Sequence, residues 1–174
     1  ALRVVYSPLC GAGGEPVSEM LTRLGAELHI PENQRLPSGE FASCPTPNPE
    51  TDSAFDENYK LAAQCRPDII LATDPDSDRI AAAIPVGGGF RKLSGNEMGC
   101  LLLDYILRNL RKNGTLPEKP VAVKSIVSTP LADRIAAALG CEMRTVLTGF
   151  KYIGGVILEL EEQGCPERFV LGFE

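Results

Sequence analysis

The segment from Ile69 to Ile80 constrains the fold most strongly. It opens with the unbroken apolar run Ile69-Ile70-Leu71-Ala72-Thr73 and continues into three aspartates at alternate positions. A short apolar run of this kind is typical of a strand that is buried on both faces of a sheet. In open α/β sheets, ligands bind outside the carboxyl ends of the strands. The segment therefore predicts an α/β fold with a functional site directly after this strand.

The three aspartates, Asp74, Asp76 and Asp78, predict a metal site. At neutral pH, carboxylates this close repel one another unless a cation neutralises them. Oxygen-only ligands favour Mg²⁺ or Ca²⁺. A calcium loop counted from Asp74 needs Gly at its sixth and Glu at its twelfth position, where this chain has Arg79 and Pro85. We therefore expect a Mg²⁺ site that also handles phosphate, with Arg79 as a fork for an anionic oxygen. An acidic turn without an ion is the alternative.

Strand and helix patterns alternate along the whole chain, which predicts an α/β protein with largely parallel pairing. A glycine-rich turn near residues 87–94 predicts two consecutive three-layer α/β/α units, residues 1–92 and 93–174, with mixed, mainly parallel sheets. The expected strands cover residues 3–6, 26–30, 69–73, 80–86, 121–127, 141–146 and 169–174. The expected helices cover residues 16–24, 55–65, 95–110, 130–139 and 153–162.

Composition excludes several classes of function. The net charge is −6 and the basic residues form no cluster, so we expect no nucleic-acid binding. No apolar run reaches the length of a membrane span. A single histidine, His29, argues against multi-histidine zinc sites and a His-based triad. The six cysteines contain no C-x-x-C pair and predict free thiols in a reducing, cytoplasmic compartment.

Two loops stand out. Residues 7–14 form a glycine-rich loop between an expected strand and helix, an order that resembles an anion-binding turn. However, Pro16 replaces the third glycine of the dinucleotide fingerprint and no GK[ST] is present, so we interpret the loop as a tight βα turn. Residues 31–51 are rich in Pro, Gly, Ser and Asn, and a loop of this length in a compact domain is usually functional or disordered.

The ordered set of motifs resembles the middle of an α-D-phosphohexomutase of the phosphoglucomutase/phosphomannomutase superfamily. Asp74–Arg79 is similar to the D-G-D-x-D-R metal loop of that family, with Pro75 in place of its usual glycine. The opening strand and glycine loop are similar as well. Three further matches are the P-N-P-E segment at 47–50, T-G-F-K-x-I-G at 148–154, and G-F-E at 172–174, the start of a sugar loop.

The resemblance implies an isomerase, an intramolecular phosphotransferase that works through a phosphoserine and a sugar 1,6-bisphosphate. The three aspartates would hold Mg²⁺, with a phosphoserine oxygen as a further ligand, and Arg79 would steady the phosphoryl group or orient the sugar. The phosphosugar substrate would be contacted by Thr148, Gly149, Lys151 and Glu174. Lys124 and Lys151 are weaker candidates for a phosphate or general-acid role, and each has the simpler interpretation of a solvated lysine.

Parts of the family pattern are missing. Neither the T-A-S-H-N-P serine motif of the first domain nor the fourth domain occurs, so we expect a fragment, domain two plus most of domain three, that has no mutase activity alone. Glucose, mannose and pentose phosphates all stay open as substrates. A haloacid-dehalogenase-type phosphatase fits less well, because that class usually has Thr or Val where Asp78 stands. A non-catalytic module that binds a divalent ion is a third alternative.

Overall fold

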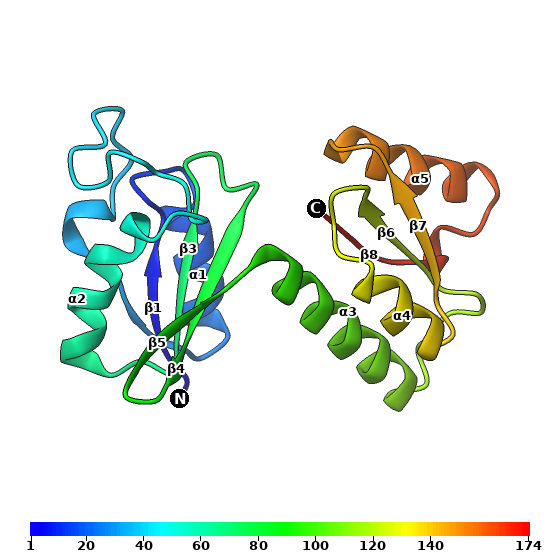
Figure 1. Cartoon of the computed structure of the whole chain (residues 1–174), viewed down its shortest axis with the longest axis horizontal. Coiled ribbons are helices and arrows are strands. Elements are labelled where there is room, and N and C mark those ends of the chain that lie inside the picture. The colour runs from blue at the N-terminus through cyan, green and yellow to red at the C-terminus, as the bar shows by residue number, and fades with distance from the viewer. The chain divides into compact units, whose positions relative to one another are not determined.

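The computed structural model describes residues 1–174, which form two compact units, Ala1–Gly95 and Asn96–Glu174 (Figure 1). The boundary expected from the sequence, between residues 92 and 93, falls inside strand β5 (Gly89–Leu93). The observed division lies at the start of helix α3 (Gly95–Lys112) instead. Each unit has its own sheet and its own core.

The first unit contains a five-stranded mixed sheet in the order β2-β1-β3-β4-β5. Strand β1 pairs in parallel with β2 and β3, whereas β3–β4 and β4–β5 are antiparallel. The strands are β1 (Arg3–Ser7), β2 (Glu27–His29), β3 (Ile69–Thr73), β4 (Ile80–Val86) and β5. The predicted α/β class with mixed sheets is confirmed, and the central apolar run is the buried strand β3.

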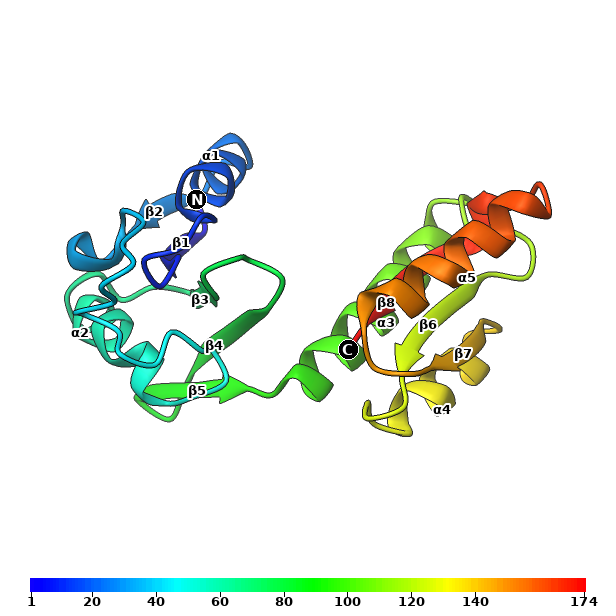
Figure 2. The ribbon, with the colours of Figure 1, turned by 90° about the horizontal axis from the view of Figure 1, so that it is seen from above.

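Helices α1 (Gly14–Arg23) and α2 (Asp56–Cys65) cover opposite faces of this sheet, as Figure 2 shows. Alternate residues of β1 and β3, such as Val5 and Ile70, pack with Phe55 and Ala62 on the α2 side. Short 3₁₀ turns at Glu32–Gln34 and Ser53–Phe55 punctuate the long connection between β2 and α2. The period of two along the strands thus places these alternate side chains in the core on the α2 side.

Strand β5 is the element that the sequence did not indicate. Val86 pairs with Gly89, so Gly87 and Gly88 form a two-residue hairpin turn, with φ of +59° and +87°. The type I′ hairpin turn, whose twist matches that of the paired strands, requires positive φ at both central positions. Glycine adopts this conformation without strain. The strand is short, charged and at the sheet edge, where such residues oppose unwanted pairing.

The second unit has an all-parallel sheet in the order β7-β6-β8, formed by β7 (Glu142–Val146), β6 (Val121–Ser125) and β8 (Phe169–Phe173). Helices α3 and α4 (Leu131–Ala138) pack on one face around Leu103, Ala122 and Ala136. Helix α5 (Phe150–Glu162) packs on the other, where Val123 meets Ile153. A 3₁₀ turn at Pro166–Arg168 precedes β8. The three-layer arrangement follows from two separate cores on one sheet.

Two expected boundaries in this unit were wrong. Strand β6 ends at Ser125 and not at Val127, because the Ser128 N–H donates to the Ser125 carbonyl and turns the chain. Residues Ile126 and Val127 are 59% and 69% exposed, so their apolar character does not reflect burial. Helix α5 begins at Phe150, earlier than the expected residue 153.

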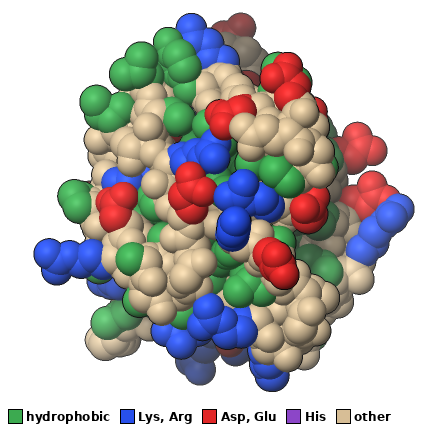
Figure 3. All heavy atoms as spheres, turned by 90° about the vertical axis from the view of Figure 1, so that its right-hand side faces the viewer, with side chains coloured by type: hydrophobic (Ala, Val, Ile, Leu, Met, Phe, Trp, Pro, Cys, Tyr) green, Lys and Arg blue, Asp and Glu red, His purple; other side chains and the backbone are tan.

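None of the helices is both long and apolar enough to cross a membrane. On the face seen in Figure 3, basic and acidic side chains are interspersed with apolar ones. Several basic residues of the second unit form ion pairs: Arg144 contacts Glu142 at 2.8 Å and Glu159 at 3.1 Å, and Arg168 contacts Glu142 at 3.1 Å. These pairs neutralise basic side chains locally.

Candidate metal centre and sugar loop

The loop Asp74–Arg79, here called the metal loop, joins the antiparallel neighbours β3 and β4 at the carboxyl end of β3. One carboxylate oxygen from each of Asp74, Asp76 and Asp78 lies within 4.8 Å of the other two. Asp74 is fully buried, and Asp76 and Asp78 are exposed. The structure therefore brings the three predicted ligands together, with one anchored carboxylate and two that face water.

Arg79 holds the buried carboxylate through both of its oxygens. The Arg79 backbone N–H donates to Asp74 Oδ1 at 3.0 Å, and the guanidinium Nε–H donates to Asp74 Oδ2 at 2.8 Å. The same Nε lies 3.7 Å from Asp78 Oδ1. Arg79 was expected to face a phosphoryl group or sugar; here it orients the Asp74 carboxylate, while its side chain stays 47% exposed.

The pKa values of the aspartates reflect this arrangement. Burial acts to raise the pKa of Asp74, but the hydrogen bonds from the Arg79 backbone and guanidinium, together with Asp78, hold it below its usual value. The pKa of Asp78 is raised, chiefly by its hydrogen bond with Asp74 and then by slight desolvation and the charges of Asp74 and Asp76. Repulsion among the three carboxylates therefore acts mainly on the exposed Asp78, and a bound cation would relieve it.

The donor set fits Mg²⁺. Mg–O bonds of about 2.1 Å place opposite ligands of an octahedron about 4.2 Å apart. The oxygens of the three aspartates lie within 4.8 Å, so small rotations of the exposed Asp76 and Asp78 side chains would close the group around one ion. Each oxygen of Asp74 accepts one hydrogen bond from Arg79, and a carboxylate oxygen has a second lone pair. The buried ligand thus keeps acceptor capacity.

Asn48 is a site residue that sequence reasoning did not single out. Its Oδ1 accepts hydrogen bonds from Arg79 Nη1 at 3.2 Å and from the Glu50 backbone N–H at 3.0 Å. Lys92 of β5 fixes the same segment, since its Nζ donates to the Glu50 carbonyl at 2.6 Å and pairs with Asp52 at 2.8 Å. The P-N-P-E match was the available signal, and the structure shows that this segment supports the arginine of the metal loop.

The residues predicted to contact the sugar lie at the carboxyl edge of the β7-β6-β8 sheet. The Gly149 N–H donates to the carboxylate of Glu174, which joins the residues after β7 and β8 on either side of β6. Gly149 has φ of +125°, a conformation that favours glycine. Thr148 is exposed beside it, and Lys151 Nζ lies 4.9 Å from the ring centroid of Tyr152. Gly149 and Glu174 are therefore in contact, with exposed Thr148 and Lys151 next to Gly149 in the chain.

Lys124 is not a solvated lysine. It is 4% exposed on β6, pairs with Asp133 at 2.8 Å, and donates to the carbonyls of Ser128 and Thr129 at 3.3 Å each. All three ammonium protons therefore have acceptors within the protein. In this structure Lys124 fixes the turn between β6 and α4.

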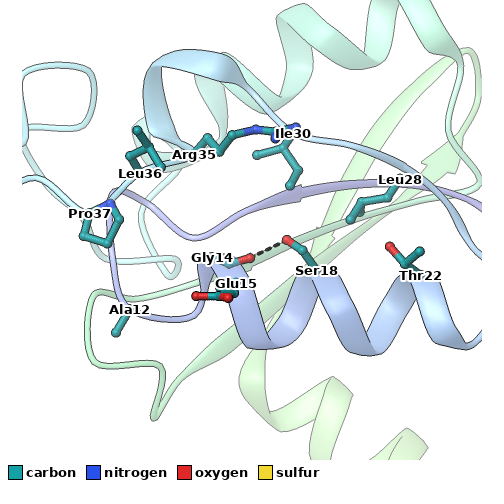
Figure 4. A pocket seen from close by; sticks show the side chains of 10 residues that line it. All are labelled: Ala12, Gly14, Glu15, Ser18, Thr22, Leu28, Ile30, Arg35, Leu36 and Pro37. Carbon is teal, nitrogen blue, oxygen red and sulfur yellow. Dashed lines mark hydrogen bonds between the residues drawn. The ribbon is translucent and has the colours of Figure 1, made fainter.

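A groove of about 620 Å³ lies beside helix α1 (Figure 4). The Ser18 hydroxyl on its wall donates to the Gly14 carbonyl. Its lining comes from the end of the loop before α1, from α1, from β2 and the residue after it, and from the segment after the first 3₁₀ turn: Ala12, Gly14, Glu15, Ser18, Thr22, Leu28, Ile30, Arg35, Leu36 and Pro37. The groove contains none of the predicted site residues.

Comparison with known proteins gives two matches that follow each other along the chain. Residues 1–87 match the model of phosphoglucomutase/phosphomannomutase α/β/α domain II, and residues 94–174 match domain III of the same family. Among solved structures, a phosphoglucomutase/phosphomannomutase family protein from Burkholderia thailandensis superimposes with a TM-score of 0.72 at 21% identity, over 95% of this chain and 32% of that one. Parafusin from Paramecium superimposes with a TM-score of 0.61 at 20% identity, over 94% and 27%. Both likenesses concern the fold.

Curated relatives share more sequence. A phosphomannomutase from Mycoplasmoides pirum is 38% identical over 98% of this chain and 30% of its own length. A phosphoglucomutase from Staphylococcus saprophyticus is 35% identical over 99% and 31%, and a probable phosphoribomutase from Schizosaccharomyces pombe is 34% identical over 94% and 28%. This chain thus spans under a third of these relatives. It belongs to the phosphoglucomutase/phosphomannomutase family, of which it carries sequence from the second and third α/β/α domains.

Proposed function

We propose that this chain is the metal-binding and sugar-binding part of a phosphosugar mutase that moves a phosphoryl group between the 1- and 6-positions of a hexose phosphate. The observation that carries the proposal is the convergence of Asp74, Asp76 and Asp78 at the end of β3, within a unit that matches the second domain of this family. Family membership removes the haloacid-dehalogenase alternative. The six free cysteines support a cytoplasmic location.

In this proposal the three aspartates hold Mg²⁺ and Arg79 orients the buried one. The bound ion supplies Lewis-acid polarisation of a phosphoryl oxygen. Phosphoryl transfer requires little covalent chemistry from the protein beyond positioning and charge neutralisation, which suits a site made of carboxylates and one arginine. The Arg79 side chain is half-exposed, so the guanidinium can also meet an anionic oxygen while Nε stays on Asp74.

The sugar is bound by the second unit. Glu174 accepts hydrogen bonds from sugar hydroxyls, and the exposed Thr148 hydroxyl and the Gly149 backbone add polar contacts. Lys151 supplies a positive charge for a phosphate. The contact between the Gly149 N–H and the Glu174 carboxylate supports the role, because it holds the carboxylate at the edge where ligands bind in parallel sheets.

The phosphoryl donor is a phosphoserine that lies outside these 174 residues, and the intermediate is a sugar 1,6-bisphosphate. This part of the proposal rests on the small share of each relative that the chain spans, 28–31%. The isolated chain therefore binds the ion weakly and converts no substrate. A pentose phosphate is the second candidate substrate, since one similar protein is named a probable phosphoribomutase.

Calorimetric titration with Mg²⁺ tests the metal site. The wild-type chain is expected to bind one equivalent, and Asp76→Asn, which removes a charge from an exposed ligand, is expected to weaken binding at least tenfold. Asp104→Asn on α3 is the control, because Asp104 is also an aspartate in an ion pair but is not one of the three clustered ligands. Equal binding by wild type and Asp76→Asn would contradict the proposed ligand set.

An activity measurement tests the phosphoserine. The purified chain is expected to show no conversion of glucose 1-phosphate to glucose 6-phosphate in the presence of Mg²⁺ and glucose 1,6-bisphosphate. The same assay on a longer protein that includes the preceding domain and the following domain provides the positive control. Turnover by the 174-residue chain alone would contradict the placement of the phosphoryl carrier outside it.

A further inference from the structure

The glycine-rich loop between β1 and α1, residues 8–14 and here called the glycine loop, packs directly on the metal loop. The Ala12 N–H donates to the Pro75 carbonyl at 2.8 Å. A Cβ atom on Gly11 would lie 2.4 Å from Pro75 Cα and 2.6 Å from Pro75 O. Because these are backbone atoms, no side-chain rotation could relieve the overlap. Only glycine at position 11 allows the metal loop to keep this path.

Gly13 makes the corresponding contact with the other half of the metal loop. A Cβ atom there would lie 2.5 Å from Ser77 Oγ, 2.7 Å from Tyr6 Oη and 2.9 Å from Thr73 Oγ1. Ser77 stands between Asp76 and Asp78 and has φ of +63°, a conformation that costs free energy for a residue with a side chain. The Ser77 hydroxyl donates to the Asp74 carbonyl at 3.5 Å, so turning it away from a new methyl group would break a contact within the metal loop.

The two glycines are needed for close approach and not for an unusual backbone conformation. Gly13 has φ of −66°, which any residue can adopt, and Gly11 is not among the glycines with positive φ. Absence of a side chain is also what lets one backbone approach another closely. The requirement comes from the metal-loop backbone at Gly11, and from the side chains of Ser77, Tyr6 and Thr73 at Gly13.

The glycine loop is itself held firmly. The Ser7 hydroxyl donates to Gln34 Oε1 at 2.7 Å and accepts from the Leu9 N–H at 3.0 Å, and the Cys10 N–H donates to the Gln34 carbonyl at 3.2 Å. Leu9 and Cys10 are buried and left-handed, with φ of +48° and +61°. Non-glycine residues keep that conformation only where the surrounding structure imposes it. The loop is therefore a stiff support.

We propose that the glycine loop is a positioning element for the metal loop, with Gly11 and Gly13 setting the spacing of the three aspartates through Pro75 and Ser77. The inference rests on the proposed metal site, and it assigns a role to residues that touch neither metal nor substrate. Groups that orient metal ligands from outside the coordination shell typically change affinity by roughly 10–100-fold when altered.

The first test uses the metal-free chain. Gly13→Ala is compared with Gly14→Ala, whose Cβ would lie 2.8 Å from the Arg35 carbonyl, and with Gly39→Ala, which has open space. In ¹H–¹⁵N spectra, Gly13→Ala is expected to shift the amide signals of the metal loop, whereas Gly14→Ala shifts those near Arg35. Unchanged metal-loop signals in folded Gly13→Ala would overturn the proposal.

The second test is Mg²⁺ affinity, measured calorimetrically on the same variants. Gly13→Ala is expected to weaken binding by roughly 10–100-fold. Gly14→Ala is expected to keep it within twofold even if it lowers the melting temperature. A loss of affinity that follows only the loss of stability across all variants would overturn the role. If the wild-type chain binds no Mg²⁺, the proposed function fails, and the amide signals still decide the role of the glycine loop.

Gly13→Ala could fail to fold, and a rescue variant covers that outcome. Ser77→Gly removes the hydroxyl nearest to the new methyl group and also relieves the left-handed residue. Gly13→Ala/Ser77→Gly is then expected to be more stable than Gly13→Ala, because only the contacts with Tyr6 Oη and Thr73 Oγ1 remain. Gly13→Ala/Arg66→Gly is the control, because Arg66 is also left-handed, with φ of +48°, but caps helix α2. Equal rescue by both glycines, or by neither, would contradict a specific contact between Gly13 and Ser77.

Discussion

Replacing Arg79 with Met should destabilise the first unit by about 1–2 kcal/mol at pH 7. The guanidinium donates to an Asp74 carboxylate whose side chain is 1% exposed, at 2.8 Å. Two unit charges about 4 Å apart interact by about 4 kcal/mol at an effective dielectric constant of 20. The Arg79 side chain is 47% exposed, so solvent screening reduces this energy, and the backbone N–H of residue 79 would still donate to Oδ1. The estimate of about 1–2 kcal/mol therefore falls below the cost of breaking a fully buried pair.

The effect should depend on pH. Native interactions hold the pKa of Asp74 below its usual value, so they contribute stability above the unfolded pKa, about 3.9. That contribution is lost as the pH falls through the native pKa. The difference between wild type and Arg79→Met should consequently be full at pH 7 and shrink below about pH 4, where Asp74 is protonated in the unfolded state.

The assay is urea unfolding followed by amide NMR signals of β1 and β3, which report the first unit alone. Arg108→Met is the matched control, since Arg108 pairs with Asp104 at 2.8 Å on an exposed helix face. An exposed pair of this type contributes about 0.3–0.5 kcal/mol. If Arg79→Met costs no more than Arg108→Met, or if its cost stays constant down to pH 3, the coupling between Arg79 and the buried carboxylate is refuted.

Three further predictions concern buried polar groups. Asn58 is fully buried on α2, and neither its Oδ1 nor its Nδ2 has a hydrogen-bond partner, so Asn58→Leu should raise the free energy of unfolding by about 1 kcal/mol in urea titrations; a fall would refute the lack of partners. Lys124→Met should cost about 2–4 kcal/mol, because it leaves two turn carbonyls and Asp133 without their donor, and an unchanged urea midpoint would contradict this. Burial raises the pKa of Cys141 to about 11, so iodoacetamide at pH 7.5 should modify Cys165 well before Cys141; mass spectrometry of tryptic peptides would show the reverse order if the thiol were accessible.

Much of the fold could be predicted from hydrophobic periodicity, because the buried strands and amphipathic helices carry the pattern directly. Strand β5 was missed because it is a short edge strand that contains Arg91 and Lys92. Its sequence therefore lacks the apolar run that marks a buried strand. Ile126 and Val127 caused the opposite error, because they were predicted to extend strand β6 and do not belong to it. They have strand-forming side chains, but a turn closed by a backbone hydrogen bond leaves them exposed. The residue types show that Ile126 and Val127 favour strands, but they do not show which hydrogen bonds the backbone makes.

The candidate site was partly predictable for a related reason. Asp74, Asp76 and Asp78 stand at alternate positions within five residues, so their proximity follows from local spacing. Gly149 and Glu174 meet only because β7 and β8 both flank β6. The family motifs named each residue as a sugar contact but did not predict that the two touch. Asn48 lies in the long loop before α2 and contacts Arg79, which is 31 positions further along the chain, a contact that no local pattern encodes.

The division into two units has a consequence for how substrate preference can change within this family. All three candidate metal ligands lie in Ala1–Gly95, and all the candidate sugar contacts lie in Asn96–Glu174. Recombination at the start of α3 would exchange one set without editing the other. Under the proposed function, chimeras joined near residue 95 would exchange the candidate sugar contacts of one relative for those of another and keep the candidate metal ligands.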